Sequence, residues 1–312
     1  KPGQMPYKTA AGELYDSGDF ARAMDRAARE ADCTGFATRR AASAAQGKLR
    51  GQGLCYYIEA ILGQPMETAK IELTGTGAKV YVGTQSAGQG HETVYKQLLR
   101  DRLGLELDQI EIVQGDSDQI VKGGGTGGSR SVTVQGSAIY ATSDTLLDGL
   151  LPFAEEVIGA EGAQFDPEEA VFRAPGSNTV VGLMELAERA EAEGRASLLV
   201  AEKEIRNAGR SFPNGCHIAE VEIDPETGLL TIERYTVTDD LGNMMNPMLV
   251  EGQIHGGIAQ GAGQAMNERV VFDENGQLLS ASYMDYAMPR ADNLPPMEHY
   301  LVDHSCQTPC TH

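Results

Sequence analysis

Three glycine-rich segments constrain this chain more than any other feature of its sequence. They are residues 88–93 (GQGHET), 123–131 (GGGTGGSRS) and 251–261 (EGQIHGGIAQG). Glycines lack side chains, so main-chain N–H groups in such segments can approach a ligand closely, while glutamine, serine and threonine add neutral hydrogen bonds. Because glutamine recurs in two of the segments, we expect all three to hold one large polar ligand.

Composition and charge restrict the class of protein. The chain has 312 residues, enough for two modest domains or one large one with a sizeable core. Tryptophan is absent and glycine reaches 37 residues, so we expect an aliphatic, closely packed core. The formal net charge of −20, without a concentrated basic patch, repels nucleic-acid phosphates and anionic membranes. We therefore predict no nucleic-acid partner.

The charge pattern also bears on how an anionic ligand would be held. Lys122 and Arg130 are the only basic residues beside the first two glycine-rich segments. Backbone amides and helix N-termini must therefore supply most of the binding.

Cysteine usage and hydropathy favour a cytoplasmic protein. An odd number of cysteines in a long chain lacks the density of a secreted disulfide scaffold. No apolar run approaches the roughly 20 residues of a membrane span. The start, Lys1-Pro-Gly-Gln-Met5, is neither a signal peptide nor an ordinary initiation site, so we expect the chain to begin in mid-protein. The cysteines are Cys33, Cys55, Cys216, Cys306 and Cys310.

Hydrophobic periodicity predicts helices and hairpins in the first half. Apolar residues at helical spacing behind Ser17, which can cap a first turn, predict a helix over residues 17–31. The first two glycine-rich segments each lead into a predicted helix, so both lie at helix N-termini. The other predicted elements are a strand over 47–60, a hairpin of 69–74 with 78–83, a helix over 91–103, a strand over 110–113 and a helix over 129–147.

The second half carries the third glycine-rich segment on a helix. Asn246 and Pro247 begin it, and Gln253, Gly257, Gln260 and Gln264 then recur at spacings that place them on one face. That face could contact a polar ligand. The other predicted elements are a helix over 183–192, strands over 216–223 and 229–237 around the turn 224–228, a hairpin turn at 274–276 and an irregular segment over 284–292.

Each glycine-rich segment also has a purely structural interpretation. The GxxxG pattern of Gly252 and Gly256 is typical of closely packed helices, and residues 123–131 could form a surface loop without a ligand. Residues 123–131 lack the Gly-Lys-Ser/Thr ending of a nucleotide P-loop. His91-Glu92 is similar to the start of a zinc-protease helix, but Tyr95 stands where the second histidine belongs. We reject the zinc-protease interpretation.

The C-terminal tail carries ligand-type side chains at His304, Cys306, Cys310 and His312. Pro309 and the very short intervals oppose the tetrahedral arrangement that a structural zinc site requires. We favour free thiols there and predict no metal site.

The motifs together resemble the second molybdopterin-binding half of the large subunit of molybdenum hydroxylases, the xanthine oxidase family, and most of all its aerobic carbon monoxide dehydrogenase-like members. The resemblance covers nearly the whole chain, and the order and spacing of several motifs agree. The matching segments are residues 15–20, 47–51, 88–93, 126–131, 246–247, 252–261 and 285–289.

The resemblance implies a set of cofactor-binding residues. Residues 88–93 are similar to the segment that hydrogen-bonds the cofactor near its metal end, and residues 126–131 to the groups that cradle its phosphate. The third segment carries the family's glutamine together with a neighbouring one. The implied residues are Gln89, Gly90, Gly128, Ser129, Ser131, Gln253 and Gln260.

The resemblance also implies the cofactor, the reaction and the partners. The cofactor of bacterial members is molybdopterin cytosine dinucleotide with molybdenum. The reaction is that of an oxidoreductase of the carbon monoxide, aldehyde or xanthine dehydrogenase type, a hydroxylation with oxygen from water. Electrons leave through iron–sulfur clusters and FAD on partner subunits. The chain is expected to dock with the N-terminal cofactor-binding half of the same subunit.

The family's catalytic glutamate is expected beyond His312. It lies in a Gly-Lys-Gly-x-Gly-Glu-Ala-Gly segment just after a stretch similar to residues 307–312, and this chain has no such segment. We therefore expect a fragment of a larger subunit that has no catalytic residue of its own and is inactive when isolated. A non-catalytic cofactor-binding or scaffold protein remains an alternative, as does an interaction domain whose glycines only pack helices.

The predicted fold is α+β, with small mixed sheets and helices in two subdomains. Surface left exposed where the preceding half docks would permit a homodimer. The predicted divisions are 1–45 as the tail of the preceding half or a linker, 46–150 as molybdopterin-binding subdomain A, 151–195 as a covering segment, and 196–312 as molybdopterin-binding subdomain B, incomplete at its C-terminus.

Overall fold

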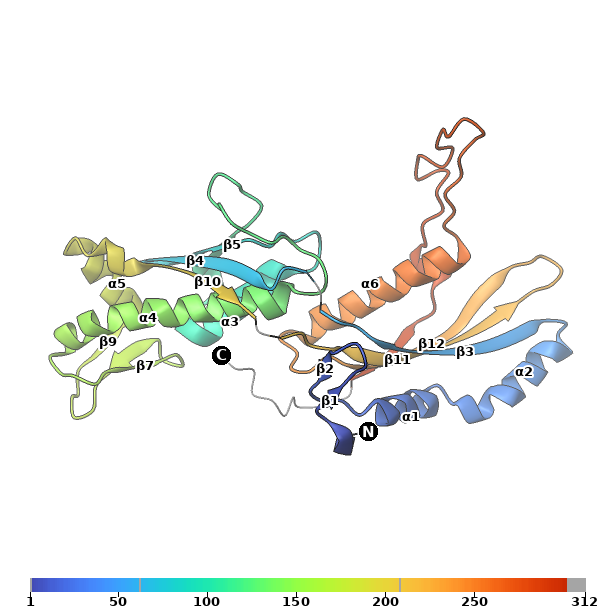
Figure 1. Cartoon of the computed structure of the whole chain (residues 1–312), viewed down its shortest axis with the longest axis horizontal. Helices are drawn as coiled ribbons and strands as arrows, with labels where there is room; N and C mark the ends of the chain where they lie inside the picture. Colours follow the sequence, from blue (N-terminus) through green and yellow to red (C-terminus); the bar gives the residue numbers. More distant parts are fainter. Residues whose placement is uncertain (1, 62, 208, 302–312) are drawn as a thin grey trace. The chain divides into compact units, whose positions relative to one another are not determined.

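The computed structural model describes residues 2–61, 63–207 and 209–301 (Figure 1). The described chain forms two compact units. The first unit combines residues up to 60 with residues from 211 onward, and the second comprises residues 61–210. The chain therefore leaves the first unit once and returns to it once.

The first unit is built around a four-stranded sheet of order β13-β12-β11-β3. β11 pairs antiparallel with β3 and β12, and β13 joins β12 in parallel. Helices α1 and α2 cover one face, and α6 runs over the other (Figure 1). The elements are β1 (Tyr7–Lys8), β2 (Leu14–Tyr15), α1 (Phe20–Glu30), α2 (Phe36–Ala45), β3 (Leu49–Ile58), β11 (Asn214–Ile223), β12 (Leu230–Asp240), α6 (Pro247–Met266) and β13 (Met297–Leu301).

Helices α1 and α2 of the predicted 1–45 division pack against this sheet. Ala27 of α1 is fully buried and packs with Cys216 of β11, because a small side chain lets the helix approach the strands closely. Arg39 of α2 pairs with Glu220, whose side chain is 1% exposed, at 2.8 Å. The predicted cap of α1 at Ser17 is wrong, since the Asp19 side chain accepts the capping hydrogen bond from the amide of Arg22.

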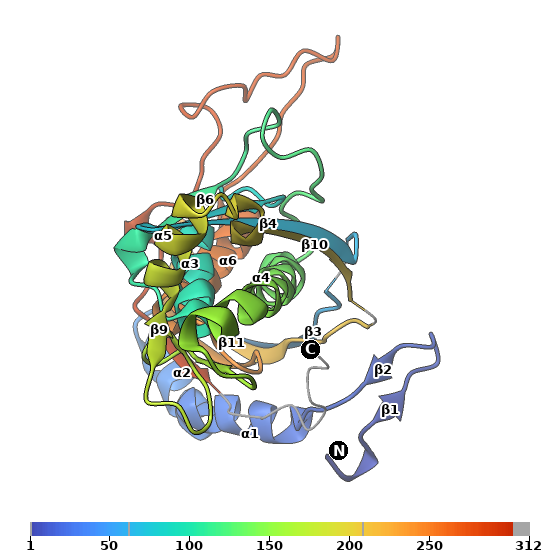
Figure 2. The ribbon, with the colours of Figure 1, turned by 90° about the vertical axis from the view of Figure 1, so that its left-hand side faces the viewer.

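The second unit contains a four-stranded sheet of order β10-β4-β5-β6. β4 alternates buried and half-buried residues, so one face is covered. Helices α3 and α4 lie side by side against that face (Figure 2). The elements are β4 (Met66–Thr74), β5 (Gly77–Val82), α3 (His91–Leu103), β6 (Ile110–Val113), α4 (Gly136–Ile158), β7 (Gln164–Asp166), β8 (Val171–Arg173), β9 (Val180–Gly182), α5 (Leu183–Ala192) and β10 (Val200–Arg206).

Residues 151–195, the predicted covering segment, belong to this compact unit. α4 continues to Ile158 and so crosses the predicted boundary at residue 150. The small antiparallel sheet of β7, β8 and β9 and the helix α5 then bury Phe172, Leu183 and Leu186. Their burial joins the segment to the core of residues 61–210.

Most element predictions are confirmed, and so is the α+β class. The helices predicted over 91–103 and 183–192 and the strand over 110–113 coincide with α3, α5 and β6. The turn at 274–276 lies inside a short hairpin closed by the Phe272–Leu278 bridge. Cys306, Cys310 and the rest of the tail considered for zinc lie outside the described residues.

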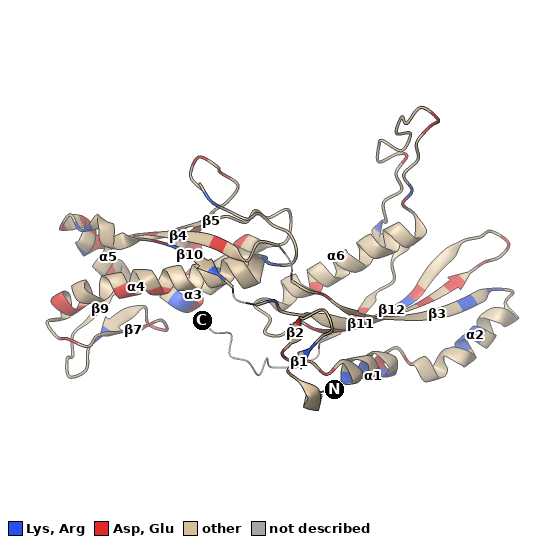
Figure 3. Ribbon diagram, in the orientation of Figure 1, with Lys and Arg blue, Asp and Glu red and all other residues tan. Residues whose placement is uncertain are grey.

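Charged residues are spread through both units (Figure 3). Basic residues of α1 and α2 pair with carboxylates, as in Arg26 with Glu30 and Arg39 with Asp32. Within the part of the chain that the structure describes, no group of histidine, cysteine and carboxylate side chains is arranged to hold a metal ion. No described helix is long and apolar enough to cross a membrane.

The core of the second unit can be tested by cavity formation. Ile71 is fully buried, so Ile71→Ala should lower the free energy of unfolding of this unit by about 2–5 kcal/mol. Val121→Ala, at a side chain that is 91% exposed, should change it by less than about 0.5 kcal/mol. Urea unfolding read by hydrogen exchange in residues 66–82 measures both variants. Equal effects would contradict the assigned core.

Candidate functional site

Two of the three glycine-rich segments lie at one edge of the second unit's sheet. β5 and β6 are parallel, so their carboxyl ends meet at the same edge. Residues 83–90 follow β5 and lead into α3, while residues 114–130 follow β6 and lead into a π-helical turn, Ser131–Gln135, and α4. Ligands of open α/β sheets bind outside the carboxyl ends of strands. The segments predicted to share a ligand are thus neighbours.

Direct hydrogen bonds hold these two loops together. The amide of Gly125 donates to the carbonyl of Gly83 over 3.2 Å. Thr126 and Gln85 exchange a pair of bonds, since Oγ1 accepts from the Gln85 amide at 3.1 Å and donates to the Gln85 carbonyl at 2.6 Å. A Cβ on Gly83 would lie 2.4 Å from the Cα of Gly123, so the crossing requires glycine.

A buried ion pair lies beneath the crossing. Arg130 and Glu67 meet at 2.6 Å with side chains that are 2% and 0% exposed. The same Glu67 oxygen accepts the amide of Gly124 at 2.8 Å. Three other N–H groups of Arg130 donate to the carbonyls of Gln64, Met66 and Gly125. Arg130 is therefore committed to shaping the loop and cannot act as the flanking cation for an anion.

Two further buried side chains fix the loop ends. The Oε1 atom of Gln135 accepts the amide of Gly83 at 3.0 Å. The hydroxyl of Tyr95 lies 2.7 Å from Oγ1 of Thr84 and donates to the carbonyl of Ser131 at 3.5 Å. Burial raises the pKa of Tyr95 to about 12, so the phenol keeps its proton at neutral pH. Tyr95 thereby connects the start of the first loop with the end of the second glycine-rich segment.

The structure brings five predicted site residues together in the second unit. Gln89 folds onto its own loop, where Oε1 accepts the amide of Ala87. Gly90 has a φ of +75° and begins α3 without a side-chain cap. Gly128 and Ser129 have φ values of +62° and +59° in an exposed turn, and Ser131 is buried at the start of the π-helical turn. A positive φ is uncommon for serine, so the turn is held by its surroundings.

The other two predicted residues, Gln253 and Gln260, lie on α6 of the first unit and are exposed. A Cβ on Gly252 or Gly256 would meet nothing within 4 Å, so this GxxxG pattern does not pack a helix among the described residues. Gly263 is closely packed, because a Cβ there would lie 2.7 Å from Pro289. The glycine and glutamine face of α6 is therefore open.

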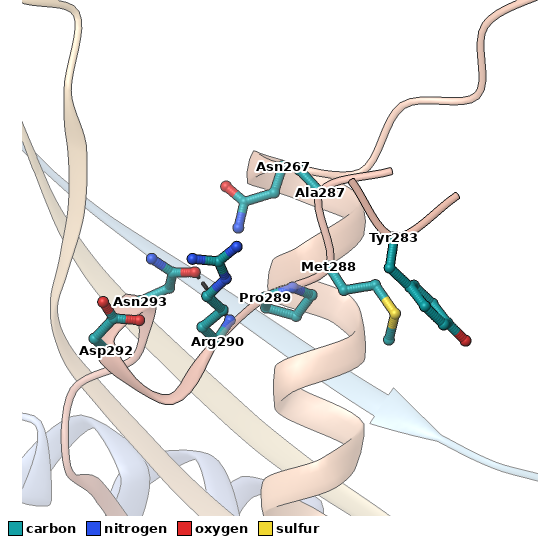
Figure 4. A pocket seen from close by; sticks show the side chains of 8 residues that line it. All are labelled: Asn267, Tyr283, Ala287, Met288, Pro289, Arg290, Asp292 and Asn293. Carbon is teal, nitrogen blue, oxygen red and sulfur yellow. Dashed lines mark hydrogen bonds between the residues drawn. The ribbon is translucent and has the colours of Figure 1, made fainter. Parts of the chain in front are cut away.

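A pocket of about 700 Å³ lies at the end of α6 and includes no predicted site residue (Figure 4). The amide of Arg290 donates to Oδ1 of Asn293 over 2.9 Å, which folds the segment after Pro289 into its wall. The pocket is lined by Asn267, Tyr283, Ala287, Met288, Pro289, Arg290, Asp292 and Asn293.

The donor set at the sheet edge fits a polar, anionic ligand. The helical segments that begin at His91 and Ser131 have no side-chain cap, so their first amides can bind an anion. Nδ1 of His91 and Oε2 of Glu67 are buried and have no hydrogen-bond partner among the described residues. Burial lowers the pKa of His91, which leaves a neutral ring. This edge therefore suits an anionic ligand bound through backbone amides.

Sequence reasoning missed Glu67, Gln135 and the structural role of Arg130. One signal was available for Glu67, which shares the inward positions of β4 with Ala69 and Ile71. A carboxylate at an inward position needs a partner. Gln135 carried no comparable signal, because its role depends on the approach of Gly83 from another strand.

The comparison with known families decides which family the chain belongs to. The model of the molybdopterin cofactor-binding domain matches residues 26–295. The chain belongs to this molybdopterin cofactor-binding family. It is 32% identical, over 99% of its length, to the carbon monoxide dehydrogenase large chain of Hydrogenophaga pseudoflava, and covers 40% of that protein. The predicted resemblance is confirmed.

Solved structures agree with this molybdopterin cofactor-binding fold. Carbon monoxide dehydrogenase from Oligotropha carboxidovorans matches 97% of the chain with a TM-score of 0.83 and 28% identity, and the chain covers 40% of its length. Quinoline 2-oxidoreductase from Pseudomonas putida 86 matches 99% with a TM-score of 0.87, at 24% identity and over 42% of its own length, which supports the fold alone. The molybdopterin-binding chain thus spans about two-fifths of these relatives.

The buried pair can be tested by removing one charge. Glu67→Gln would leave the Arg130 guanidinium buried without a counter-ion, so unfolding of the second unit should become easier by about 3–5 kcal/mol. Glu204→Gln breaks the exposed pair with Lys122 and should cost no more than about 1 kcal/mol. Denaturant unfolding compares the two. A Glu67→Gln variant as stable as Glu204→Gln would show that the pair does not brace the loops.

Proposed function

We propose that this chain supplies part of the binding site for molybdopterin cytosine dinucleotide in a molybdenum-dependent oxidoreductase of the carbon monoxide dehydrogenase type. One observation carries the proposal. Two uncapped helix N-termini and two exposed glycine loops meet at one sheet edge, and a buried ion pair fixes them there. Membership of the molybdopterin cofactor-binding family supports the same assignment.

The chain would hold the cofactor through amides instead of cations. Amides at the start of α3 and at Ser131 would face the pyrophosphate, where the helix dipoles favour negative charge. The Oε1 atom of Gln89 accepts a hydrogen bond from its own loop, so its Nε2 group would be the part that donates to the cofactor. Gln253 and Gln260 would contribute amide groups from α6. The cofactor, when bound, would supply the oxidation and reduction chemistry, and these residues would orient it and exclude water.

The remaining parts of the enzyme would come from elsewhere. The base glutamate, the N-terminal cofactor-binding half and the iron–sulfur and FAD subunits are proposed on the family resemblance, as are a cytoplasmic location and self-association. Carbon monoxide, aldehydes and nitrogen heterocycles are the substrate classes that the resemblance leaves open.

Cofactor retention tests the site residues. In the full-length parent protein, Gln89→Ala, Ser129→Ala or Gln260→Ala should each lower the fraction of cofactor retained after gel filtration, with affinity reduced by about three- to tenfold for one lost hydrogen bond. Gln277→Ala, in the exposed turn after α6, is the matched control and should change nothing. Retention equal to the control in all three variants would favour a packing role for the glycine-rich segments.

Turnover tests the proposed division of labour. The isolated 312-residue chain contains no Gly-Glu-Ala-Gly segment of the kind that carries the family's base, so we expect no hydroxylation above background with an artificial electron acceptor. The intact parent assayed in parallel is the control. Rates for the isolated chain close to those of the parent would contradict the proposal.

A further inference from the structure

Residues 267–290 form an arm that extends beyond the end of α6 and returns to it (Figure 1). The helix holds both ends of the arm. The amide of Asn267 donates to the carbonyl of Gly263 over 2.9 Å, and Pro289 packs against Gly263 so closely that a Cβ there would not fit. The hydroxyl of Tyr286 donates to the carboxylate of Glu268 over 2.5 Å, which joins the outgoing and the returning segment. The base of the arm is therefore fixed.

Hydrogen bonds within the arm give its outer part the backbone of a hairpin. The amide of Leu279 donates to the carbonyl of Val271 over 2.8 Å, and the amide of Asp273 donates to the carbonyl of Gln277 over 2.9 Å. A two-stranded hairpin that stands alone in water is only marginally stable. The outer part of the arm therefore needs a covering surface to become firmly held.

The arm leaves large apolar side chains exposed. Tyr283 is 85% exposed and Met284 is 94% exposed. Single exposed apolar side chains are ordinary on a protein surface, whereas a group of them in one segment marks a surface that binds a partner. The exposed apolar residues of the arm are Val270, Phe272, Leu279, Tyr283, Met284 and Met288.

Apolar residues lie on both faces of the hairpin in the arm. Phe272 and Leu278 are bridge partners, so their side chains share one face. Val271 and Leu279 are their neighbours along the chain and lie on the other face, because side chains alternate along a strand. A partner that covered one face would leave the other in water. The arm therefore fits a partner that surrounds it.

The pocket at the base of the arm offers a place for side chains of the same partner. It has a volume of about 700 Å³, with Tyr283 and Met288 along one side and Asn267, Arg290 and Asn293 along the other (Figure 4). The first two residues would cover an apolar side chain. The guanidinium and the two amides would donate to a carboxylate or carbonyl oxygen. The pocket thus suits an apolar anchor with a hydrogen-bond acceptor beside it.

Charge and length indicate which partner covers the arm. A second copy of the chain is a poor partner, because it would bring the same net charge of −20 and the same acidic tip, Asp273 and Glu274. The chain spans 40% of each of two carbon monoxide dehydrogenase large chains, so a parent of that length has more residues outside these 312 than within them. A segment of the same polypeptide also binds at a high effective concentration. The rest of the parent subunit is therefore the favoured partner.

We propose that the arm of residues 267–290 is the element through which the rest of the parent subunit holds this chain. Apolar side chains of that part close over both faces of the hairpin. Another segment of it places an apolar side chain beside Met288 and a hydrogen-bond acceptor beside Arg290. This proposal rests on the proposed function, in which the chain is one part of a larger subunit, and it assigns the docking to named residues.

Methionine oxidation in the full-length parent tests the docking without a variant and without cofactor. The rate at which peroxide oxidises a methionine follows its exposure. In the folded parent, Met284 should be oxidised at least about tenfold more slowly than in the urea-unfolded parent, because the docked part covers it. In the 312-residue chain, where Met284 is 94% exposed, the rate should lie within about twofold of the unfolded value. Mass spectrometry of the peptide that contains Met284 measures all three rates.

A charge placed on the hairpin tests whether the arm itself is the element that docks. Phe272→Asp should raise the oxidation rate of Met284 in the parent about tenfold, because a carboxylate opposes burial, and should leave the rate in the 312-residue chain unchanged. Leu229→Asp is the matched control in another turn of the first unit, with a side chain that is 66% exposed against 60% for Phe272. It should change neither rate.

Two results would overturn the docking of the arm by the rest of the subunit. One is a rate for Met284 in the folded parent equal to that in the unfolded parent. The other is protection in the 312-residue chain that increases with protein concentration, which would assign the arm to a second copy. An uncovered arm in a parent that loses cofactor on Gln89→Ala would overturn the docking alone. A covered arm in a parent whose retention is unchanged by Gln89→Ala, Ser129→Ala and Gln260→Ala would support the docking and overturn only the cofactor site.

Discussion

The buried Arg130–Glu67 pair is the interaction on which the candidate site depends. Removing two charges from water is costly, and the pair is tolerated because the guanidinium donates four hydrogen bonds to acceptors at a strand end or in the loop itself. This geometry draws the start of β4 and the glycine loop to one point. The loop backbone is thereby fixed before any ligand arrives, which lowers the ordering cost of binding.

Because Arg130 is paired with Glu67, it does not contribute its charge to binding an anionic ligand. A chain with a net charge of −20 has few cations to offer, and the arginine nearest the glycine loops is neutralised by Glu67. Recognition of an anion then falls to amides at helix N-termini, whose dipoles are fixed by the fold. The partial positive charge of such a site does not change with pH while the protein is folded, because backbone amides do not titrate.

The first unit joins distant parts of the chain through charges as well. Glu220 is 1% exposed and accepts bonds from Arg39 and Arg50, so it fastens α2 and β3 to β11. Hydrogen bonds from Arg39 and then Arg50 hold the pKa of Glu220 below its usual value. On α6, by contrast, Ile258 and Gly263 are the buried residues.

The sequence by itself determined the elements and the ligand segments. Periodicity located α3, α5 and β6, and Asn246 with Pro247 located the start of α6, because local propensity and capping act over a few residues. Motif order also carried the family resemblance. Tertiary structure decided which segments pack together. The pairing of β3 with β11, the burial of α1 and the Gly83–Gly123 crossing depend on contacts between residues far apart in the chain, and no local pattern specifies those partners. The same reason explains why the structural role of Arg130 and that of Gln135 were missed: the role of each side chain is set by what another segment brings against it.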